Sequence, residues 1–213
     1  DIRLRVGYVG ESRYGLLNVL HKLDEQKLPL MAERYAQLAE APGEEVVRPL
    51  EATRLRVDEA NLLITVGKLG LDRSRPVVVF CPGAEYGPSK RWPAANFAAL
   101  AQRLAARGRA VWLIGSDKDR EIGEEIAAHS QGAALNLCGR TDLAAAIDLI
   151  SAAQLVVSND SGLMHVAAAV GRPLIALFGS SSATHTPPLA SAAAKIVEIQ
   201  GLDCRPCFQR ECP

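Results

Sequence analysis

The chain has 213 residues, of which 48% are hydrophobic and 23% are charged. This is the composition of an ordinary globular protein with one substantial core. Lysine plus arginine and aspartate plus glutamate each total 24, so the formal net charge is zero. Without a global basic field we expect no nucleic-acid partner, and any anion site must be local.

The termini and the hydropathy pattern bear on the setting of the protein. No apolar run approaches the roughly 20 residues that a membrane helix needs, and Asp1 to Arg5 do not resemble a secretory signal. A cytoplasmic setting is the simplest interpretation. Asp1 has no initiator Met before it, and a Pro- and Cys-rich tail stops abruptly at Pro213, so we expect a fragment cut at both ends.

Residues 1–75 are expected to form an interdomain segment and the edge of a truncated N-terminal domain. A helix is predicted at about residues 30–41, followed by a break at Pro42-Gly43. A strand is predicted from Leu50 to Val57, and a further helix is predicted to be capped by Asp58.

From Pro76 onward, short apolar runs alternate with helical patterns, which is typical of strand–helix units and a parallel sheet. Five such repeats favour an α/β class, a Rossmann-like doubly wound domain over residues 76–200, followed by a Cys-rich tail at 201–213. The predicted strands are 77–80, 110–114, 134–137, 155–157 and 174–178. The predicted helices are one through Phe97 and Leu104, closed by Gly108, and others at 119–129, 143–150 and 161–170.

The loop after the first of these strands, residues 81–93, is the first candidate site, because ligands bind beyond the carboxyl ends of strands in open α/β sheets. It holds two glycines, whose backbone can approach a phosphate closely, and Lys90 beside Arg91. Lys90 can place a point charge on a diphosphate, while Trp92 packs the next helix against the sheet. The alternative is a solvated loop with a surface Lys-Arg pair, and the Gly-Lys-Ser/Thr ending of a P-loop is absent.

A second candidate is the turn Asn159-Asp160-Ser161-Gly162, which follows a buried strand and opens a helix. Free backbone N–H groups at such a helix start can bind an anion. The Asp160 carboxylate can accept hydrogen bonds from sugar hydroxyls, and His165 lies one helical turn further on. The alternatives are a simple N-cap at Asp160 or Ser161 and a structural histidine.

Two further strand-to-helix turns are weaker candidates. In the turn from Gly115 to Glu121, an acidic residue such as Asp119 can bind ribose hydroxyls. The alternative, which explains the pattern at least as well, is that the acidic residues are there because the helix dipole favours negative charge at a helix start. Gly179-Ser180-Ser181-Ser182 is either a phosphate-binding or hinge loop or, more simply, a polar turn.

Together these motifs resemble the ADP-heptose:lipopolysaccharide heptosyltransferases, and the loop sequence looks most like the heptosyltransferase II branch. The family is similar in fold to the two-domain GT-B glycosyltransferases, and the resemblance covers nearly the whole chain. It rests on Pro82–Pro93, Cys138–Thr141, Asn159–Ala169 and Pro187-Pro188, with Arg13–Asn18 resembling the interdomain region.

The resemblance implies that this chain is the donor-binding half of an inverting glycosyltransferase. The reaction would move L-glycero-D-manno-heptose from ADP-heptose to the first heptose of the lipopolysaccharide inner core, at the inner face of the inner membrane, without a metal or cofactor. The catalytic base would be an aspartate of the missing N-terminal domain. The residues carried over are Lys90 on the diphosphate as leaving-group stabiliser, Glu85 and Tyr86 beside it, Asp119 near the ribose, and Asp160, Ser161, Gly162 and His165 along the heptose and phosphates.

Other functions stay open at this point. The chain could belong to a GT-B enzyme with another donor, to a sugar-nucleotide epimerase, or to a non-catalytic nucleotide-binding module. A dehydrogenase is disfavoured because no Gly-x-Gly-x-x-Gly follows a strand.

The five cysteines fall into two groups. Cys81 and Cys138 end predicted core strands and are expected to be buried thiols. Cys204, Cys207 and Cys212 form a Cys-x2-Cys-x4-Cys cluster, one residue short of a structural zinc set. A disulfide among them is the alternative, although a cytoplasmic setting argues against it. The pattern assigns this cluster no role.

Overall fold

The structure is a computed structural model that describes residues 2–10, 12–13, 15–189 and 193–212. Its contacts divide the chain into two compact units. Unit 1 comprises Asp1–Glu51 and Ala183–Pro187, and unit 2 comprises Ala52–Ser182 and Pro188–Pro213. Within the residues described, no helix combines the length and apolar character needed to cross a membrane.

Unit 1 contains a small parallel sheet and one helix. Strands β1 (Val6–Tyr8) and β2 (Val19–His21) pair in parallel, and α1 spans Met31–Gln37. The helix predicted at about residues 30–41 is confirmed in a shorter form. The two strands were not predicted, because three residues are too few to show a period-2 pattern.

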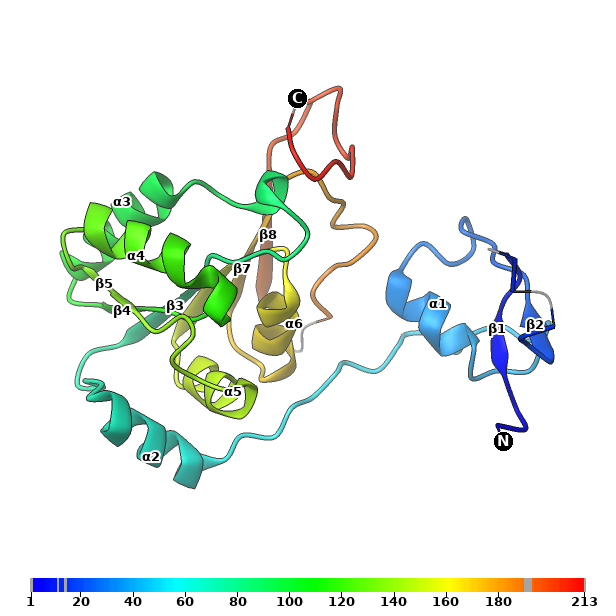
Figure 1. Ribbon diagram of the computed structural model, residues 1–213, viewed down its shortest axis with the longest axis horizontal. Helices are drawn as coiled ribbons and strands as arrows, with labels where there is room; N and C mark the ends of the chain where they lie inside the picture. The colour runs from blue at the N-terminus through cyan, green and yellow to red at the C-terminus, as the bar shows by residue number, and fades with distance from the viewer. Residues whose placement is uncertain (1, 11, 14, 190–192, 213) are drawn as a thin grey trace. The chain divides into compact units, whose positions relative to one another are not determined.

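Unit 2 is a parallel sheet wrapped by helices (Figure 1). Its strands run in the order β5-β4-β3-β6-β7-β8. Counted from β3 as the first, this is the order 3-2-1-4-5-6 of a doubly wound Rossmann sheet. The elements are α2 (Glu59–Leu69), β3 (Val77–Cys81), α3 (Ala94–Ala105), β4 (Ala110–Leu113), α4 (Arg120–His129), β5 (Ala134–Asn136), α5 (Leu143–Ser151), β6 (Leu155–Asn159), α6 (Gly162–Ala169), β7 (Leu174–Phe178) and β8 (Ala194–Glu198), with short 3₁₀ turns at Pro88–Lys90 and Asp117–Asp119.

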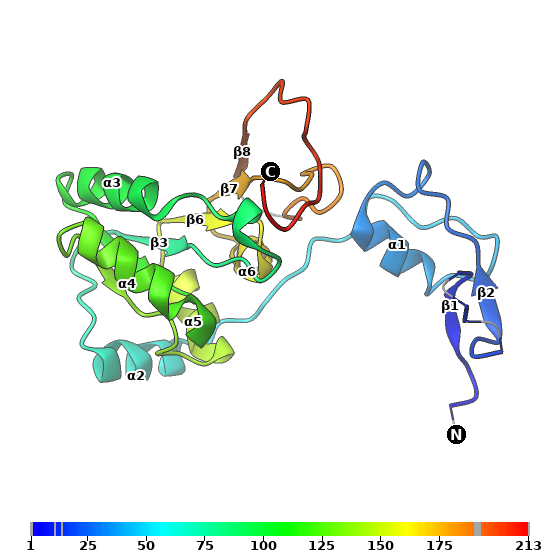
Figure 2. The same ribbon diagram turned by 45° about the horizontal axis from the view of Figure 1, so that its top comes forward.

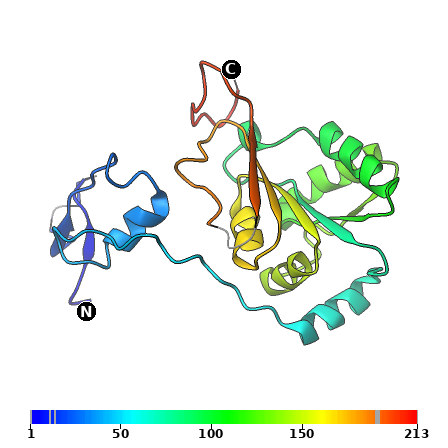
Figure 3. The same ribbon diagram turned by 180° about the vertical axis from the view of Figure 1, so that it is seen from behind.

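The predicted fold class, the five strands and the four helices between them are confirmed, but one further strand was missed. Strand β8 pairs in parallel with β7 and forms the edge of the sheet, as the view from behind shows (Figure 3). Four of its five residues are exposed. An edge strand of this kind lacks the buried apolar run by which the other strands were recognised.

The predicted strand from Leu50 to Val57 is wrong. These residues run without strand pairing, and within them the Leu55 N–H bonds to the Ala169 carbonyl at the end of α6. Among the residues that the structure describes, no strand pairs with this stretch. The following helix α2 is confirmed, because the Asp58 side chain accepts the Asn61 N–H. By its contacts α2 belongs with unit 2, whereas the sequence pattern grouped it with residues 1–75.

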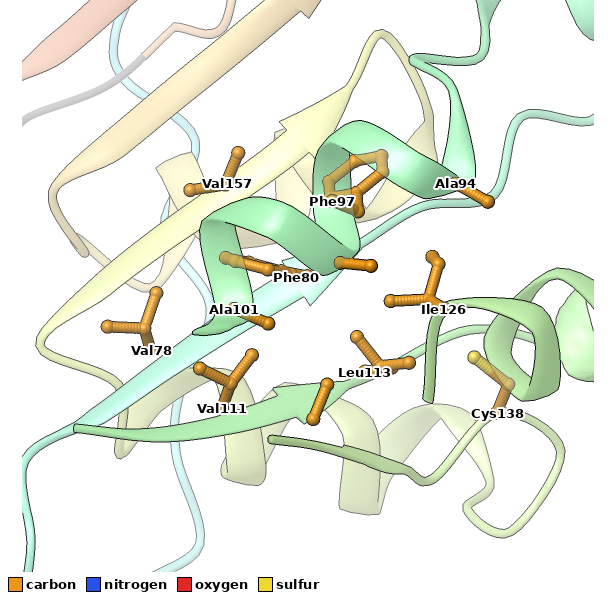
Figure 4. Close-up of a cluster of buried hydrophobic side chains, with 12 residues drawn as sticks. Val78, Phe80, Ala94, Phe97, Ala101, Val111, Leu113, Ile126, Cys138 and Val157 are labelled. Carbon is orange, nitrogen blue, oxygen red and sulfur yellow. The ribbon is translucent and has the colours of Figure 1, made fainter. Parts of the chain in front are cut away.

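The core that carries the sheet lies between strands β3 and β4 and helices α3 and α4 (Figures 2 and 4). All five residues of β3 are buried. Phe80 meets Phe97 of α3 at a ring-centroid distance of 5.4 Å, and Trp92 meets the same ring edge-on at 4.9 Å. The aromatic contacts therefore fix where the chain leaves β3 and where α3 begins.

Asp148 on α5 connects the early helix α2 to the sheet unit. Its side chain is 3% exposed and accepts hydrogen bonds from the Asp58 N–H at 2.9 Å and from Asn61 Nδ2 at 2.5 Å.

We expect Asp148→Ala to lower the free energy of unfolding by roughly 1.5–3 kcal/mol, because two donors lose a charged acceptor. Urea unfolding followed by circular dichroism measures this. Glu124→Ala, at an exposed position of α4, is the control and should change the value by less than about 0.5 kcal/mol. Equal losses in the two variants would show that the connection contributes nothing.

Candidate functional site

The candidate site lies where the strand order of the sheet reverses, between β3 and β6. Loops that leave the sheet here diverge and open a crevice at the carboxyl ends of the strands. Asn159, the fully buried last residue of β6, holds both ends of the loop that follows β3. Its Nδ2 donates to the Pro82 carbonyl at 2.6 Å, and its Oδ1 accepts the Trp92 N–H at 3.0 Å. We call residues 82–93 the β3–α3 loop.

Lys90 of this loop and Asp160 after β6 form a largely buried ion pair. Lys90 Nζ lies 2.6 Å from Asp160 Oδ2, and the two side chains are 17% and 5% exposed. The buried Ser181 hydroxyl donates to the same carboxylate oxygen at 2.6 Å. The predicted residues Lys90 and Asp160 are thus brought together, and their charges compensate each other in a dry environment.

The start of α6 lies directly beside this pair. Ser161 occupies the N-cap position, but its side chain makes no capping hydrogen bond. Asp160 does not cap the helix either, because its carboxylate receives Lys90 and Ser181. The simple N-cap alternative therefore does not describe this turn. The first N–H groups of α6, beginning at Gly162, have no side-chain cap and suit an anion.

A cleft of about 500 Å³ runs from this turn across the ends of β3 and β4. Four of the predicted residues line it, namely Glu85, Asp119, Ser161 and Gly162. Asp119 Oδ2 accepts both the N–H and the hydroxyl of Ser116, which holds the carboxylate in place. The apolar wall is formed by Leu143, Ala146, Leu163 and Val166. A cleft with one apolar wall and a few fixed polar groups suits a flat ring joined to polar substituents.

Gly83 shows why a small residue is needed at the floor of the cleft. A Cβ atom at this position would overlap the Asp119 carboxylate. The sequence pattern attributed the loop glycines to phosphate approach, whereas the structure shows that Gly83 makes room for an acidic side chain.

Glu85 and Tyr86 have different surroundings. Glu85 forms an exposed ion pair with Lys118 at 2.6 Å, and the hydrogen bond from Lys118 lowers the pKa of its carboxyl. Such exposed pairs contribute little stability. Tyr86 lies under the Lys90 ammonium, 5.2 Å from Nζ to the ring centroid, and contributes a cation–π contact. Tyr86 is therefore a neighbour of Lys90. The residues that line the cleft do not include Tyr86, Lys90, Asp160 or His165.

His165 lies on the first turns of α6, where it interacts electrostatically with both members of the ion pair. Burial lowers the pKa of its imidazole, Asp160 opposes this shift, and Lys90 adds to it. The neutral imidazole is therefore favoured, which keeps a hydrogen-bonding group near the pair without a second positive charge.

Three groups near the site carried no clear sequence signal. Asn159 and Ser181 lie within predicted candidate turns, but the sequence predicts no separate role for either residue. A side chain that joins two distant loops cannot be recognised from the sequence of one loop. The Thr141 hydroxyl, beside the cleft, is buried and has no partner among the residues described.

The cysteines are all free thiols in this structure. Cys81 and Cys138 are buried as predicted, and burial raises the pKa of the Cys138 thiol to about 12. Within the described part of the chain, no three His, Cys, Asp or Glu side chains are grouped so that they could hold a metal ion.

A doubly wound parallel sheet with a loop-lined cleft at its switch point defines an α/β protein of the Rossmann type. The particular family follows from comparison with known proteins. The profile of glycosyltransferase family 9 (heptosyltransferase) matches residues 1–213, and the chain belongs to this family. The resemblance read from the motifs is confirmed.

Individual relatives support the same assignment. Lipopolysaccharide heptosyltransferase 2 of Escherichia coli strain K12 is 47% identical over 206 residues, covering 92% of this chain and 59% of that protein. Lipooligosaccharide heptosyltransferase 2 of Haemophilus influenzae is 44% identical over 212 residues, covering 92% of this chain and 60% of the relative. The chain thus spans 59–60% of the length of these curated relatives.

The solved structure of Escherichia coli ADP-heptose lipopolysaccharide heptosyltransferase II is similar with a TM-score of 0.87 at 44% identity. The match covers 97% of this chain and 67% of that one. It confirms the expected α/β fold of GT-B type.

We expect the lowered pKa of His165 to make stability pH-dependent. Because the folded pKa lies below the ordinary value of about 6.5, this contribution is complete above that pH and is lost as the pH falls through the folded pKa. Because His165 is partly exposed and solvent weakens its interactions, urea unfolding between pH 7.5 and 5.5 should show only a small decline, well below about 1.4 kcal/mol per pH unit, that His165→Gln removes. His129→Gln, on exposed α4 surface, is the control. If the pH profiles of wild type and His165→Gln coincide, the histidine is not linked to folding.

Proposed function

We propose that this chain is the donor-binding part of an inverting heptosyltransferase, which transfers L-glycero-D-manno-heptose from ADP-heptose to the first heptose of the lipopolysaccharide inner core. Membership of glycosyltransferase family 9 and the names of the relatives support this. The observation that carries it is the buried pair of Lys90 and Asp160 at the start of α6.

The proposed chemistry requires stabilisation of a departing nucleoside diphosphate. Negative charge grows on the bridging oxygen and phosphates as the bond to the sugar breaks. Lys90 supplies a cation whose position is already fixed, and the uncapped N–H groups of α6 supply further donors. Both groups are preorganised, and the Lys90 side chain is also largely shielded from water. They therefore stabilise this charge more strongly than mobile surface groups would.

Asp160 has two tasks in this proposal. Its Oδ2 atom holds Lys90 in place, and the carboxylate accepts hydrogen bonds from hydroxyls of the heptose. A donor phosphate then shares Lys90 with Asp160 and does not bind an isolated cation. This keeps the pair close to neutral before the donor arrives.

The remaining predicted residues place the rest of the donor. Asp119 is proposed to hold the ribose, with the apolar wall of Leu143 and Leu163 against the adenine. Glu85 and Tyr86 lie beside the diphosphate. Ser161, Gly162 and His165 are proposed to line the heptose and phosphate side.

The acceptor and the proton transfer are the other part of this proposal. We propose that the base is an aspartate of an N-terminal domain, which would also hold the lipopolysaccharide acceptor. The enzyme would act as a peripheral protein at the cytoplasmic face of the inner membrane. This chain would then bind donor without turning it over.

Calorimetric titration of the chain with ADP, UDP and GDP tests the assignment. We expect ADP to bind most tightly, and Lys90→Met to weaken ADP binding roughly tenfold to a hundredfold, because a charge-assisted contact contributes about 1.5–3 kcal/mol. A preference for UDP or GDP would contradict the ADP-heptose assignment and favour another donor.

The controls separate charge from folding. Lys68→Ala, at an exposed position of α2, should bind ADP like the wild type. Because Lys90→Met leaves Asp160 buried without its partner, the double variant Lys90→Met/Asp160→Asn removes that charge and should keep the fold. Wild-type ADP affinity in a folded double variant would refute the proposed role of the pair.

A further inference from the structure

The Cys-rich tail, residues 201–212, lies against the β3–α3 loop (Figures 1 and 2). The Ser89 N–H donates to the Arg210 carbonyl at 3.2 Å, and the Ser89 hydroxyl donates to the Gln209 carbonyl. Arg210 Nε donates to the Tyr86 carbonyl at 2.7 Å, and the Tyr86 hydroxyl donates to the Phe208 carbonyl. The tail therefore holds the loop segment that immediately precedes Lys90.

The tail also holds a second loop, residues 179–182 after β7, mainly through Arg205. The Arg205 side chain is only 13% exposed, and its Nε donates to the Gly179 carbonyl at 2.5 Å. One terminal nitrogen, Nη2, donates to the Ser181 carbonyl at 3.0 Å and to Glu198 at 2.7 Å. The Phe208 N–H adds a bond to the Ser180 carbonyl at 2.9 Å. One guanidinium thus ties this loop to the end of β8.

The two loops held by the tail also contact each other and the ion pair. The Ser180 N–H donates to the Ser89 carbonyl at 3.2 Å, and their hydroxyls lie 2.8 Å apart. A Cβ atom at Gly179 would collide with the Ser89 carbonyl, so the backbones approach as closely as glycine allows. From the same loop, Ser181 donates to the Asp160 oxygen that receives Lys90.

We propose that the tail is a positioning element of the donor site and that Arg205 is its central positioning residue. Arg205 fixes the 179–182 loop, which presents the Ser181 hydroxyl to Asp160 and supports the backbone before Lys90. Loop-borne groups lose precision unless surrounding contacts hold them. The planar guanidinium of Arg205 has five N–H donors, and four of them are engaged, with Gly179, Ser181, Glu198 and Ile199. This inference rests on the proposed function, because it takes Lys90 as the group that binds the diphosphate.

The test compares the affinities of ADP and AMP, measured by calorimetry on the chain. AMP reports whether the nucleoside cleft is intact, whereas the additional affinity for ADP reports the position of Lys90. We expect Arg205→Ala to reduce the ratio of ADP to AMP affinity by roughly threefold to tenfold, within the range of coupling between contacting residues. A tail that only stabilises the fold would lower the melting temperature and leave this ratio unchanged.

Further variants keep the test decisive. Arg205→Lys retains the charge but loses the fork, and should reduce the ratio even if Arg205→Ala does not fold. Ser181→Ala should reduce it as well, and Arg205→Ala/Ser181→Ala should lose less than the product of the single losses, because both act on Asp160. Arg103→Ala, exposed on α3, should leave the ratio unchanged.

The outcomes distinguish the two proposals. If the wild type does not bind ADP more tightly than AMP, or if Lys90→Met leaves the ratio of ADP to AMP affinity unchanged, the proposed function itself fails. Suppose that Lys90→Met abolishes the preference for ADP over AMP but that folded Arg205→Ala and Arg205→Lys retain it. The proposed donor site then stands, and the positioning role of the tail is refuted.

Discussion

The side-chain amide of Asn159 is the constraint on which the proposed donor site depends. It lies at the point where the strand order of the sheet reverses, and it is bonded to Pro82 at the start of the β3–α3 loop and to Trp92 near its end. Its neighbour Trp92 packs on the core residue Phe97, so the loop closes onto the most rigid part of unit 2. A buried amide satisfied on both sides suits this task, because any shift would leave a polar group unpaired.

A buried ion pair is tolerable only on such a rigid base. Removing a lysine and a carboxylate from water costs several kcal/mol for each ion, and their attraction compensates for this only at good geometry. Lys90 and Asp160 have that geometry, with Ser181 as an additional donor. The pair is therefore weak evidence for stability and stronger evidence for a function that needs a preorganised charge, as the proposed departure of ADP does.

The sequence allowed most of the sheet to be predicted, because β3, β4, β6 and β7 are buried apolar runs and the helices between them show a 3.6-residue period. The rule that ligands bind at strand carboxyl ends then placed Lys90 and Asp160 on one edge before their contact was known. Exposed β8 and the unpaired stretch from Leu50 to Val57 were misjudged for a common reason. Local patterns report propensity and burial, while strand pairing depends on whether a neighbouring edge is available.

The contacts that complete the site were beyond sequence patterns for a further reason. Ser181 and Arg205 are polar residues in polar segments, and their importance arises only when the loop after β7 and the tail after β8 contact the β3–α3 loop. The spacing of the three tail cysteines suggests metal ligands or disulfide partners, whereas the tail contacts that hold the two loops come from its backbone and from Arg205 and Arg210, which lie between the cysteines. The composition of the tail indicates reactive thiols. The tail is held in place by hydrogen bonds, and their geometry is determined only by the fold.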